Sequence, residues 1–296
     1  MEPRQSDLES SAKLPVWLTI KQAYHSFFSN LPKVLRISWL WLILLTALGW
    51  AIGTMHAQVI AGLREPGMSG QAPLQFFPTG FPVLLFINYI VGIVAASSMA
   101  VAWHRLLLLG EEPGQSGSNV MSGHVWRYTG ALLLLGLIFL TAMLLIMLPL
   151  IVVGGAAASG GKNPVAGALI LIVILMFLVL SQRMLLMLPA RAIGRNEMRL
   201  GDIWRGTRGN SLRLLGGMIL AMAPVSIAAQ LILKASGLAP SAAEKDPAAI
   251  DAALKSFEAS FPMFLAAMTA FGLLAGFLLI GFLSHAFRNI FDATER

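Results

Sequence analysis

Six long stretches of this 296-residue chain contain almost no charged side chains. A helix that crosses a lipid bilayer needs about 20 consecutive, mostly apolar residues. Only 12% of the residues are charged, whereas soluble domains carry about 25%. The sequence therefore predicts an all-α fold, a polytopic membrane bundle of six transmembrane helices. We expect these helices at about 34–59, 82–108, 129–153, 165–190, 211–235 and 261–287.

The six spans divide the chain into three parts. Residues 1–33 form an N-terminal segment, residues 34–290 the transmembrane domain, and residues 291–296 a short tail. In the N-terminal segment, apolar and aromatic residues recur at three- and four-residue steps, which predicts that they share one face of a helix. These residues are Val16, Trp17, Ile20, Tyr24, Phe27, Phe28 and Leu31. An amphipathic, aromatic helix of this kind is typical of a segment that lies in the membrane interface. Packing against a neighbouring domain is the alternative.

Lysine and arginine indicate the orientation of the spans, because these residues gather in cytoplasmic loops. If the N-terminus is cytoplasmic, the inner segments carry 16 lysines and arginines and the outer loops carry 5. We therefore expect both termini in the cytoplasm, and we assign the net charge of +7 to the inner loops rather than to a nucleic-acid partner. The first residues contain no apolar core of a cleavable signal peptide, so the first span is expected to direct insertion itself.

The segment 181–213, between the fourth and fifth spans, is the most basic part of the chain. It holds seven arginines against two acids, Glu197 and Asp202. One interpretation is a topological anchor, which explains most of these arginines by charge alone. The other is a site for anionic lipid headgroups, because a guanidinium group binds phosphate through two N–H groups at once. The residues that this second interpretation assigns to headgroup binding are Arg183, Arg191, Trp204, Arg205, Arg208 and Asn210.

The sequence contains no recognisable catalytic motif. It has no nucleophile elbow, no glycine-rich phosphate loop and no pair of histidines at metal-ligand spacing. Cysteine is absent, which excludes disulfides and zinc–thiolate sites. We therefore expect a protein that is not an enzyme and that holds no cofactor and no metal.

These features favour a non-enzymatic membrane protein, which engages anionic membrane lipids or a membrane-protein partner through its basic cytoplasmic face. No ionisable residue lies in the middle of a predicted span, although ion-driven carriers usually need one there. The alternative function is a transporter subunit or facilitator for a small or lipid-like substrate. Two pairs of glycines four residues apart, Gly49 with Gly53 and Gly272 with Gly276, indicate close packing of helices.

Three short motifs carry a resemblance to a known group of proteins. They are AVAWHRLLLLGE at 100–111, RMLLMLPARAIG at 183–194 and GDIWRGTRGN at 201–210. With these motifs the chain resembles uncharacterised bacterial inner-membrane proteins with six spans, most familiar from alphaproteobacteria. It is also similar to the membrane domain that precedes the catalytic domain of some glycerophosphodiester phosphodiesterases. The resemblance implies a multi-pass protein of the bacterial inner membrane, and we expect no phosphodiesterase domain because the chain ends just past the sixth span.

The sequence also predicts that the bundle consists of three related helical hairpins, each preceded by an interfacial amphipathic segment. An aromatic residue precedes each pair of spans and an arginine ends it. The aromatic residues are Tyr24, Trp126 and Trp204, and the arginines are Arg105, Arg183 and Arg288. Internal repeats of this kind are common in membrane folds but weak in sequence. Three unrelated hairpins are the alternative.

Overall fold

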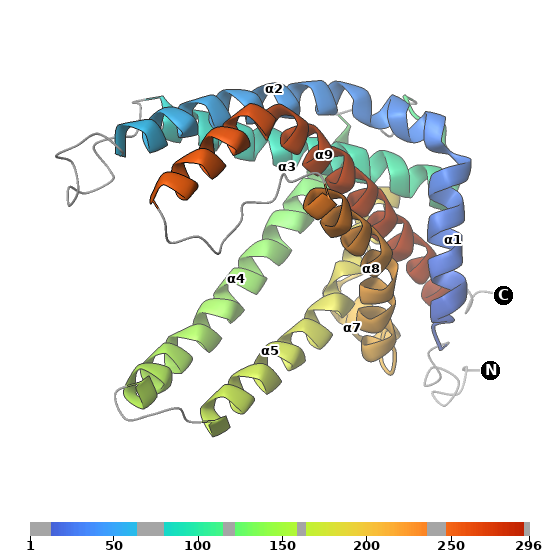
Figure 1. Cartoon of the computed structure of the whole chain (residues 1–296). Helices are drawn as coiled ribbons and strands as arrows, with labels where there is room; N and C mark the ends of the chain where they lie inside the picture. The colour runs from blue at the N-terminus through green and yellow to red at the C-terminus, as the bar shows by residue number, and fades with distance from the viewer. Residues whose placement is uncertain (1–12, 64–79, 115–121, 159–163, 236–246, 293–296) are drawn as a thin grey trace, which may run out of the picture. The chain divides into compact units, whose positions relative to one another are not determined.

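The computed structural model describes residues 13–63, 80–114, 122–158, 164–235 and 247–292 (Figure 1). Within these ranges all regular secondary structure is helical, which confirms the predicted all-α fold. The elements are α1 (Val16–Ser29), α2 (Leu31–Leu63), α3 (Phe81–Leu109), α4 (Gly123–Ala158), α5 (Pro164–Leu185), α6 (Met187–Ile193), α7 (Leu200–Gly206), α8 (Ser211–Ala235), α9 (Pro247–Phe287) and the π-helical turn η4 (Arg288–Asp292).

Six segments are long and apolar enough to cross a membrane, which confirms the predicted number of spans. Many of their apolar side chains are not covered by other parts of the protein, and Leu137 and Leu144 in α4 are more than half exposed. Apolar side chains on all sides of a long helix are expected where lipid surrounds it. The six segments are Leu31–Met55, Phe81–Leu109, Gly123–Leu145, Leu171–Ile193, Ser211–Lys234 and Phe261–Asp292.

Two spans differ from their prediction. The fourth is not one helix, because α5 ends at Leu185 and α6 begins at Met187. Pro189 explains the break: proline donates no backbone hydrogen bond, and its ring clashes with the carbonyl group four residues earlier. The third span begins earlier than predicted, since α4 starts at Gly123 and includes the interfacial segment that was expected to lead into the span. No proline lies between that segment and the span, so one helix continues through both.

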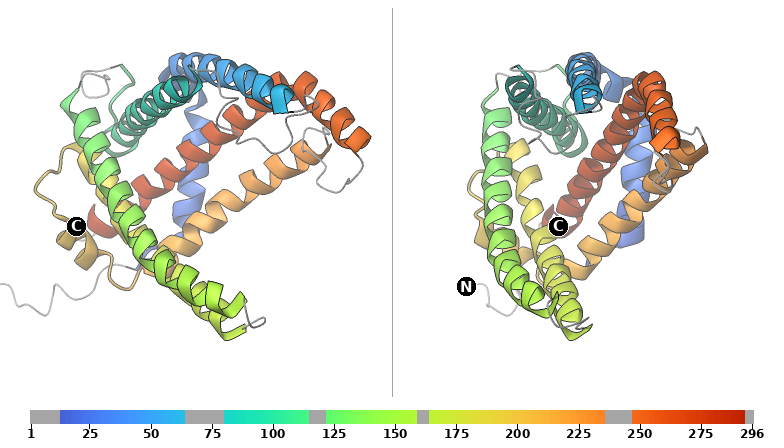
Figure 2. Two further views of the ribbon diagram at one scale, coloured as in Figure 1. Left: turned by 90° about the vertical axis from the view of Figure 1, so that its left-hand side faces the viewer. Right: turned by 60° about the vertical axis from the view of Figure 1, so that its left-hand side comes forward.

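The chain folds into two compact units, each built from segments that are far apart in the sequence. The first unit contains the described residues of Met1–Leu31, Ser97–Ala221 and Leu278–Arg296, and the second those of Pro32–Ala96 and Met222–Phe277. The first unit therefore holds α1, all of α4 to α7, and the parts of α3, α8 and α9 that are nearest to them. Within it, α4 contacts α5, which runs antiparallel to it, and also α6 (Figure 2).

Two glycines bring the helices of the first unit into close contact. A Cβ atom at Gly217 in α8 would lie 2.5 Å from the ring of Phe282 in α9 and 3.3 Å from Val16 in α1. A Cβ atom at Gly281 would lie 3.4 Å from the indole nitrogen of Trp103 in α3. Both aromatic side chains are fully buried. Glycine is required at position 217, because a side chain there would overlap a ring in a closely packed core.

One face of α1 packs against α8 and α9. Phe27 is buried on this face. The Tyr24 hydroxyl donates a hydrogen bond to the backbone carbonyl of Ala221 at 2.8 Å. The Ser26 hydroxyl and the Nε2 atom of His285 lie 2.9 Å apart. These contacts attach α1 to the bundle along its length.

The opposite face of α1 remains open. Trp17 and Phe28 are more than 60% exposed there, and the Lys21 ammonium lies 5.7 Å from the centre of the Trp17 ring. The prediction that all aromatic residues of this helix share one face is therefore wrong, because they are divided between an inner and an outer face. Neighbouring positions such as 27 and 28 lie about 100° apart around a helix, so they cannot face the same way. Exposed tryptophan, phenylalanine and lysine suit the membrane–water interface, and the location of α1 in that interface stays a prediction.

The three arginines predicted to end the hairpins, which we call the hairpin-end arginines, each donate a hydrogen bond to a backbone carbonyl of another hairpin. The arginine of the first hairpin binds the end of the second hairpin. The arginine of the second hairpin binds the segment that opens the third hairpin, and the arginine of the third hairpin binds the first hairpin. The contacts therefore form a closed cycle. They run from Arg105 to Ala192, from Arg183 to Trp204 and from Arg288 to Leu107.

The segments that open the second and third hairpins also match in their local contacts. The Thr129 hydroxyl donates to the carbonyl of Val125 at 2.8 Å, and the Thr207 hydroxyl donates to that of Ile203 at 2.7 Å. All four residues are buried. Trp126, which follows Val125, and Trp204, which follows Ile203, are both exposed. This match and the cycle of arginine contacts support the predicted repeat, which stays a prediction for the hairpins as a whole.

In the second unit, α2 meets the first half of α9 at a glycine pair that the sequence singled out. A Cβ atom at Gly49 would lie 3.2 Å from Leu265, and one at Gly53 would lie 2.1 Å from the ring of Phe261. Glycine at position 53 therefore permits this contact. The second predicted pair, in α9, has no atom within 4 Å of an added Cβ among the residues that the structure describes.

Candidate functional site

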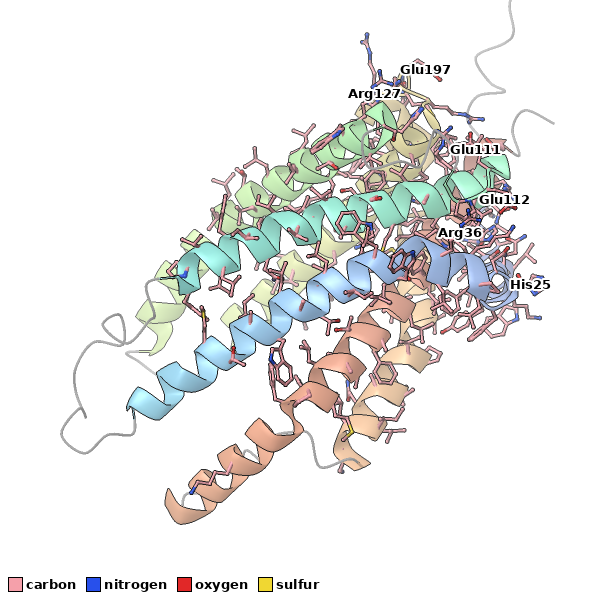
Figure 3. All side chains as sticks on the ribbon, turned by 90° about the horizontal axis from the view of Figure 1, so that it is seen from above. His25, Arg36, Glu111, Glu112, Arg127 and Glu197 are labelled. Atoms are coloured by element: carbon pink, nitrogen blue, oxygen red, sulfur yellow. The ribbon has the colours of Figure 1, made fainter. Side chains whose placement is uncertain are left out.

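The first unit has a strongly basic end, where α3, α6 and α9 finish and α4 and α8 begin. We define the basic end as residues 104–114, 122–131, 183–213 and 285–292. It contains ten arginines and five acidic residues, and Figure 3 marks it by the labels of Arg127, Glu111 and Glu197. An excess of cations of this size attracts anions. Three ion pairs within it join Arg105 to Glu111, Arg195 to Asp292 and Arg205 to Asp202.

Arg183, in the last turn of α5, points into the protein. Its guanidinium carbon lies 3.8 Å from the centre of the Trp204 ring. Its Nε atom donates to the Thr207 hydroxyl at 2.9 Å, and Nη2 donates to the Trp204 carbonyl. The residue is only 8% exposed. Two of the predicted headgroup residues, Arg183 and Trp204, are therefore engaged with each other and fasten α5 to α7.

Asn210 also has an internal partner. It is almost fully buried, and its Oδ1 atom accepts a hydrogen bond from the backbone N–H of Leu14 at 2.8 Å. Arg213 donates from Nη1 to the carbonyl of the same leucine at 3.1 Å. The side chains at the start of α8 thus hold the segment that leads into α1.

Arg205 and Arg208 lie on the exposed side of the basic end. The Arg199 N–H donates to one carboxylate oxygen of Asp202 at 2.8 Å and so caps α7, while Arg205 donates to the other oxygen at 2.7 Å. These two hydrogen bonds hold the pKa of Asp202 below its usual value. The Arg205 side chain is 81% exposed. Because an exposed ion pair of this kind is weak, the guanidinium remains accessible to an outside anion.

Arg191 does not join the other predicted residues. It lies in the last turn of α6 and lines an open cavity of about 430 Å³. Two other polar residues line the same cavity, Arg127 from the start of α4 and Asn196 from the loop after α6. The remaining lining residues are Gly130, Ala131 and Leu134 of α4 and Met187 of α6.

The turn after α6 determines where Arg191 lies. Gly194 has a φ of +87°, in the left-handed region that ends many helices. Beyond it the chain turns back, and Nη1 of Arg191 donates to the Asn196 carbonyl at 2.8 Å. A Cβ atom at position 194 would lie 3.1 Å from the His124 ring, so glycine also lets this turn approach the start of α4 closely. The turn thereby brings Arg191 and Asn196 to the helix that carries Arg127.

The two arginines of the cavity lack acidic partners. Within the described ranges neither Arg127 nor Arg191 forms an ion pair with a carboxylate. Arginine remains protonated throughout the accessible pH range and offers five N–H donors. The cavity is therefore lined by two arginines without a carboxylate partner in the described ranges, by Asn196 and by apolar residues. Such a lining can bind a phosphate group.

The sequence pointed to Arg191 but missed Arg127 and Asn196 as its neighbours. The signal for Arg127 was present, because the third and fourth spans are joined by a short predicted loop and must be antiparallel. The start of the third span and the end of the fourth then meet at one membrane face. No sequence pattern predicted that Asn196 lies near Arg191, because its position depends on the turn at Gly194.

Other chemistry is not evident in the parts of the chain that the structure describes. No group of three or more histidine, aspartate or glutamate side chains gathers there in a way that could hold a metal ion. His104 is fully buried, and its Nδ1 atom lies 2.7 Å from the Ser284 hydroxyl. This histidine thus takes part in an internal hydrogen bond between α3 and α9.

The fold defines a multi-pass transmembrane helical protein. No protein-family model matches the chain, no curated protein matches its sequence, and no solved structure matches its fold. The resemblance to bacterial inner-membrane proteins therefore identifies no family. The function has to be inferred from the basic end itself.

Proposed function

We propose that this membrane protein binds anionic lipids through its basic end and has no enzymatic activity of its own. One observation carries the proposal, the division of the arginines into an inner and an outer group. The hairpin-end arginines bind backbone carbonyls inside the protein. Arg127, Arg191 and Arg205 instead lie at the surface or line an open cavity.

This division favours lipid binding over simple anchoring. Retention of a loop in the cytoplasm requires positive charge but no particular placement of it. A headgroup site requires guanidinium groups whose N–H donors remain available to phosphate. Each such cation near an anionic leaflet contributes about 1 kcal/mol, so the three outer arginines could together favour an anionic lipid by about 3 kcal/mol.

The outer face of α1 is consistent with a location near lipid headgroups. Trp17 and Phe28 are exposed on it beside Lys21, and such side chains gather at membrane interfaces. A contact with a membrane-protein partner through the same end, and a facilitator function, stay predictions that no described contact favours over lipid binding.

The proposal is tested by native mass spectrometry of the protein extracted in mild detergent. We expect the lipids that remain bound to be richer in anionic species than the membrane from which the protein came. Replacing Arg191, Arg205 and Arg208 together by glutamine should lower this enrichment, because it removes three cations of the basic end, two of them outer arginines. The remaining arginines should preserve the topology. If the triple variant retained the same bound lipids as the wild type, the arginines would be topological anchors only.

A further inference from the structure

We propose that the cavity between α4 and α6 binds one phospholipid molecule, whose phosphate is held by Arg127, Arg191 and Asn196. This inference rests on the proposed function and specifies the place and the part of the lipid that are bound. The cavity volume of about 430 Å³ lies within the range of about 300–1,000 Å³ that is typical of small-molecule sites. It suits a headgroup with the adjoining part of an acyl chain.

The lining residues of α4 are ordered from basic to apolar. Arg127, Ala131 and Leu134 follow one another at steps of four and three residues, so they share one face of the helix. Because α4 leads away from the basic end, Leu134 lies about 10 Å further along the helix than Arg127 at 1.5 Å per residue. Leu134 is about half exposed, so the apolar part of the cavity is open on the side where lipid tails would lie.

α6 runs in the opposite direction and repeats this order. Arg191 lies in its last turn, at the basic end, and Met187 lies one turn earlier on the same face. Both helices therefore place a cation at the rim of the cavity and an apolar side chain below it. A small soluble anion would contact only the basic rim of the cavity, whereas a phospholipid would contact the rim with its phosphate and the apolar part with its acyl chain.

The rim is arranged to hold a phosphate group. One N–H of Arg191 is fixed by its hydrogen bond to the Asn196 carbonyl, which orients the guanidinium and leaves its other N–H groups for a ligand. Asn196 lines the cavity beside it, and its side-chain amide is a further potential donor. Arg127 adds a second guanidinium without a carboxylate partner in the described ranges. Glu197 is exposed at the same end (Figure 3) but does not line the cavity.

Gly130 allows the cavity to be filled without any change of charge. A Cβ atom at this position has no neighbour within 4 Å, so the leucine of a Gly130→Leu variant can enter the cavity without displacing the protein. Gly136 provides the matched control. It lies on the same helix, is equally open to an added Cβ atom and does not line the cavity. Both substitutions replace a glycine in a helix interior and should favour the helix slightly.

The measurement is a native mass spectrometry titration of the full-length protein with phosphatidylglycerol, and in parallel with phosphatidylcholine and with glycerol phosphate. We expect one phosphatidylglycerol to bind more tightly than either of the other two. Arg127→Gln and Arg191→Gln should each weaken it about fivefold, as the loss of one cation near a headgroup implies. Gly130→Leu should abolish the tight binding, and Gly136→Leu should bind like the wild type. Arg205→Gln removes a cation that does not line the cavity and should weaken binding less than Arg127→Gln does.

The alternatives give different results. If Arg205→Gln weakened binding as much as Arg127→Gln, and Gly130→Leu had no effect, the attraction would be diffuse: the site would be refuted and the proposed function would stand. Equal binding of phosphatidylglycerol and phosphatidylcholine by the wild type would refute both. Glycerol phosphate binding as tightly as the lipid would identify a soluble phosphate ligand and refute the lipid site. Thermal unfolding of each variant shows that it is folded.

Discussion

Replacing Arg183 by methionine tests whether this arginine supports the fold rather than a lipid headgroup. The substitution keeps a long side chain in the same space but removes the guanidinium group. It deletes the hydrogen bonds to the Thr207 hydroxyl and the Trp204 carbonyl, together with the stacking on the Trp204 ring. Hydrogen bonds from a charged donor contribute about 1.5–3 kcal/mol each, and a cation–π contact contributes about 0.5–2 kcal/mol.

The net effect on stability is smaller than the sum of these contacts. The buried guanidinium in the native protein has lost part of its hydration, and methionine does not suffer that cost. We therefore expect Arg183→Met to lower the free energy of unfolding by about 2–4 kcal/mol. Unfolding by sodium dodecyl sulfate in mixed micelles, followed by circular dichroism, measures this quantity.

Arg205→Met is the matched control for this experiment. Its side chain is 81% exposed and its ion pair with Asp202 lies at the surface, so its loss should leave the stability nearly unchanged. An Arg183→Met variant as stable as the wild type would refute the internal role of Arg183. Equal destabilisation by both substitutions would refute it as well, because the effect would then follow from charge alone.

Two further substitutions test the packing of the first unit. Gly217→Val should lower the free energy of unfolding by about 1–3 kcal/mol, because its Cβ atom would overlap the Phe282 ring. Gly216→Val should be tolerated, because no atom lies within 4 Å of a Cβ atom added there. Equal thermal stability of the two variants would contradict the contact between position 217 and Phe282. Asn210→Ala should cost about 1–3 kcal/mol and accelerate hydrogen exchange of the Leu14 amide, which loses its acceptor in a buried position. An unchanged exchange rate at this amide would show that the hydrogen bond is not formed.

The spans could be predicted from the sequence because a bilayer imposes one length on every helix that crosses it. That constraint is local, so runs of apolar residues reveal it without any knowledge of tertiary contacts. The break between α5 and α6 was also readable, since Pro189 removes a backbone hydrogen bond wherever it lies in a helix. The start of the third span was predicted about six residues too late, because amphipathic character does not by itself end a helix and α4 continues through the preceding segment.

The candidate site was harder to predict, because its residues meet only through packing. Seven arginines in one segment gave no indication that Arg183 would stack on Trp204 or that Asn210 would bind the backbone of Leu14. Arginine clusters in sequence show where charge is located but not which side chains have internal partners. The cavity depends on a turn at Gly194 that brings α6 to α4, and such a contact between distant segments leaves no periodic pattern.

We propose that the basic end lies at the cytoplasmic leaflet, where it would meet anionic lipids. The chain contains no cysteine, so a single introduced thiol can be labelled without background. Glu197→Cys places a thiol at an exposed position of the basic end, and Lys162→Cys places one in the loop predicted to lie on the opposite side of the membrane. With a membrane-impermeant maleimide, Glu197→Cys should react only in inside-out vesicles and Lys162→Cys only in intact cells. Labelling of Glu197→Cys in intact cells would contradict this orientation and, with it, the lipid interactions assigned to the basic end.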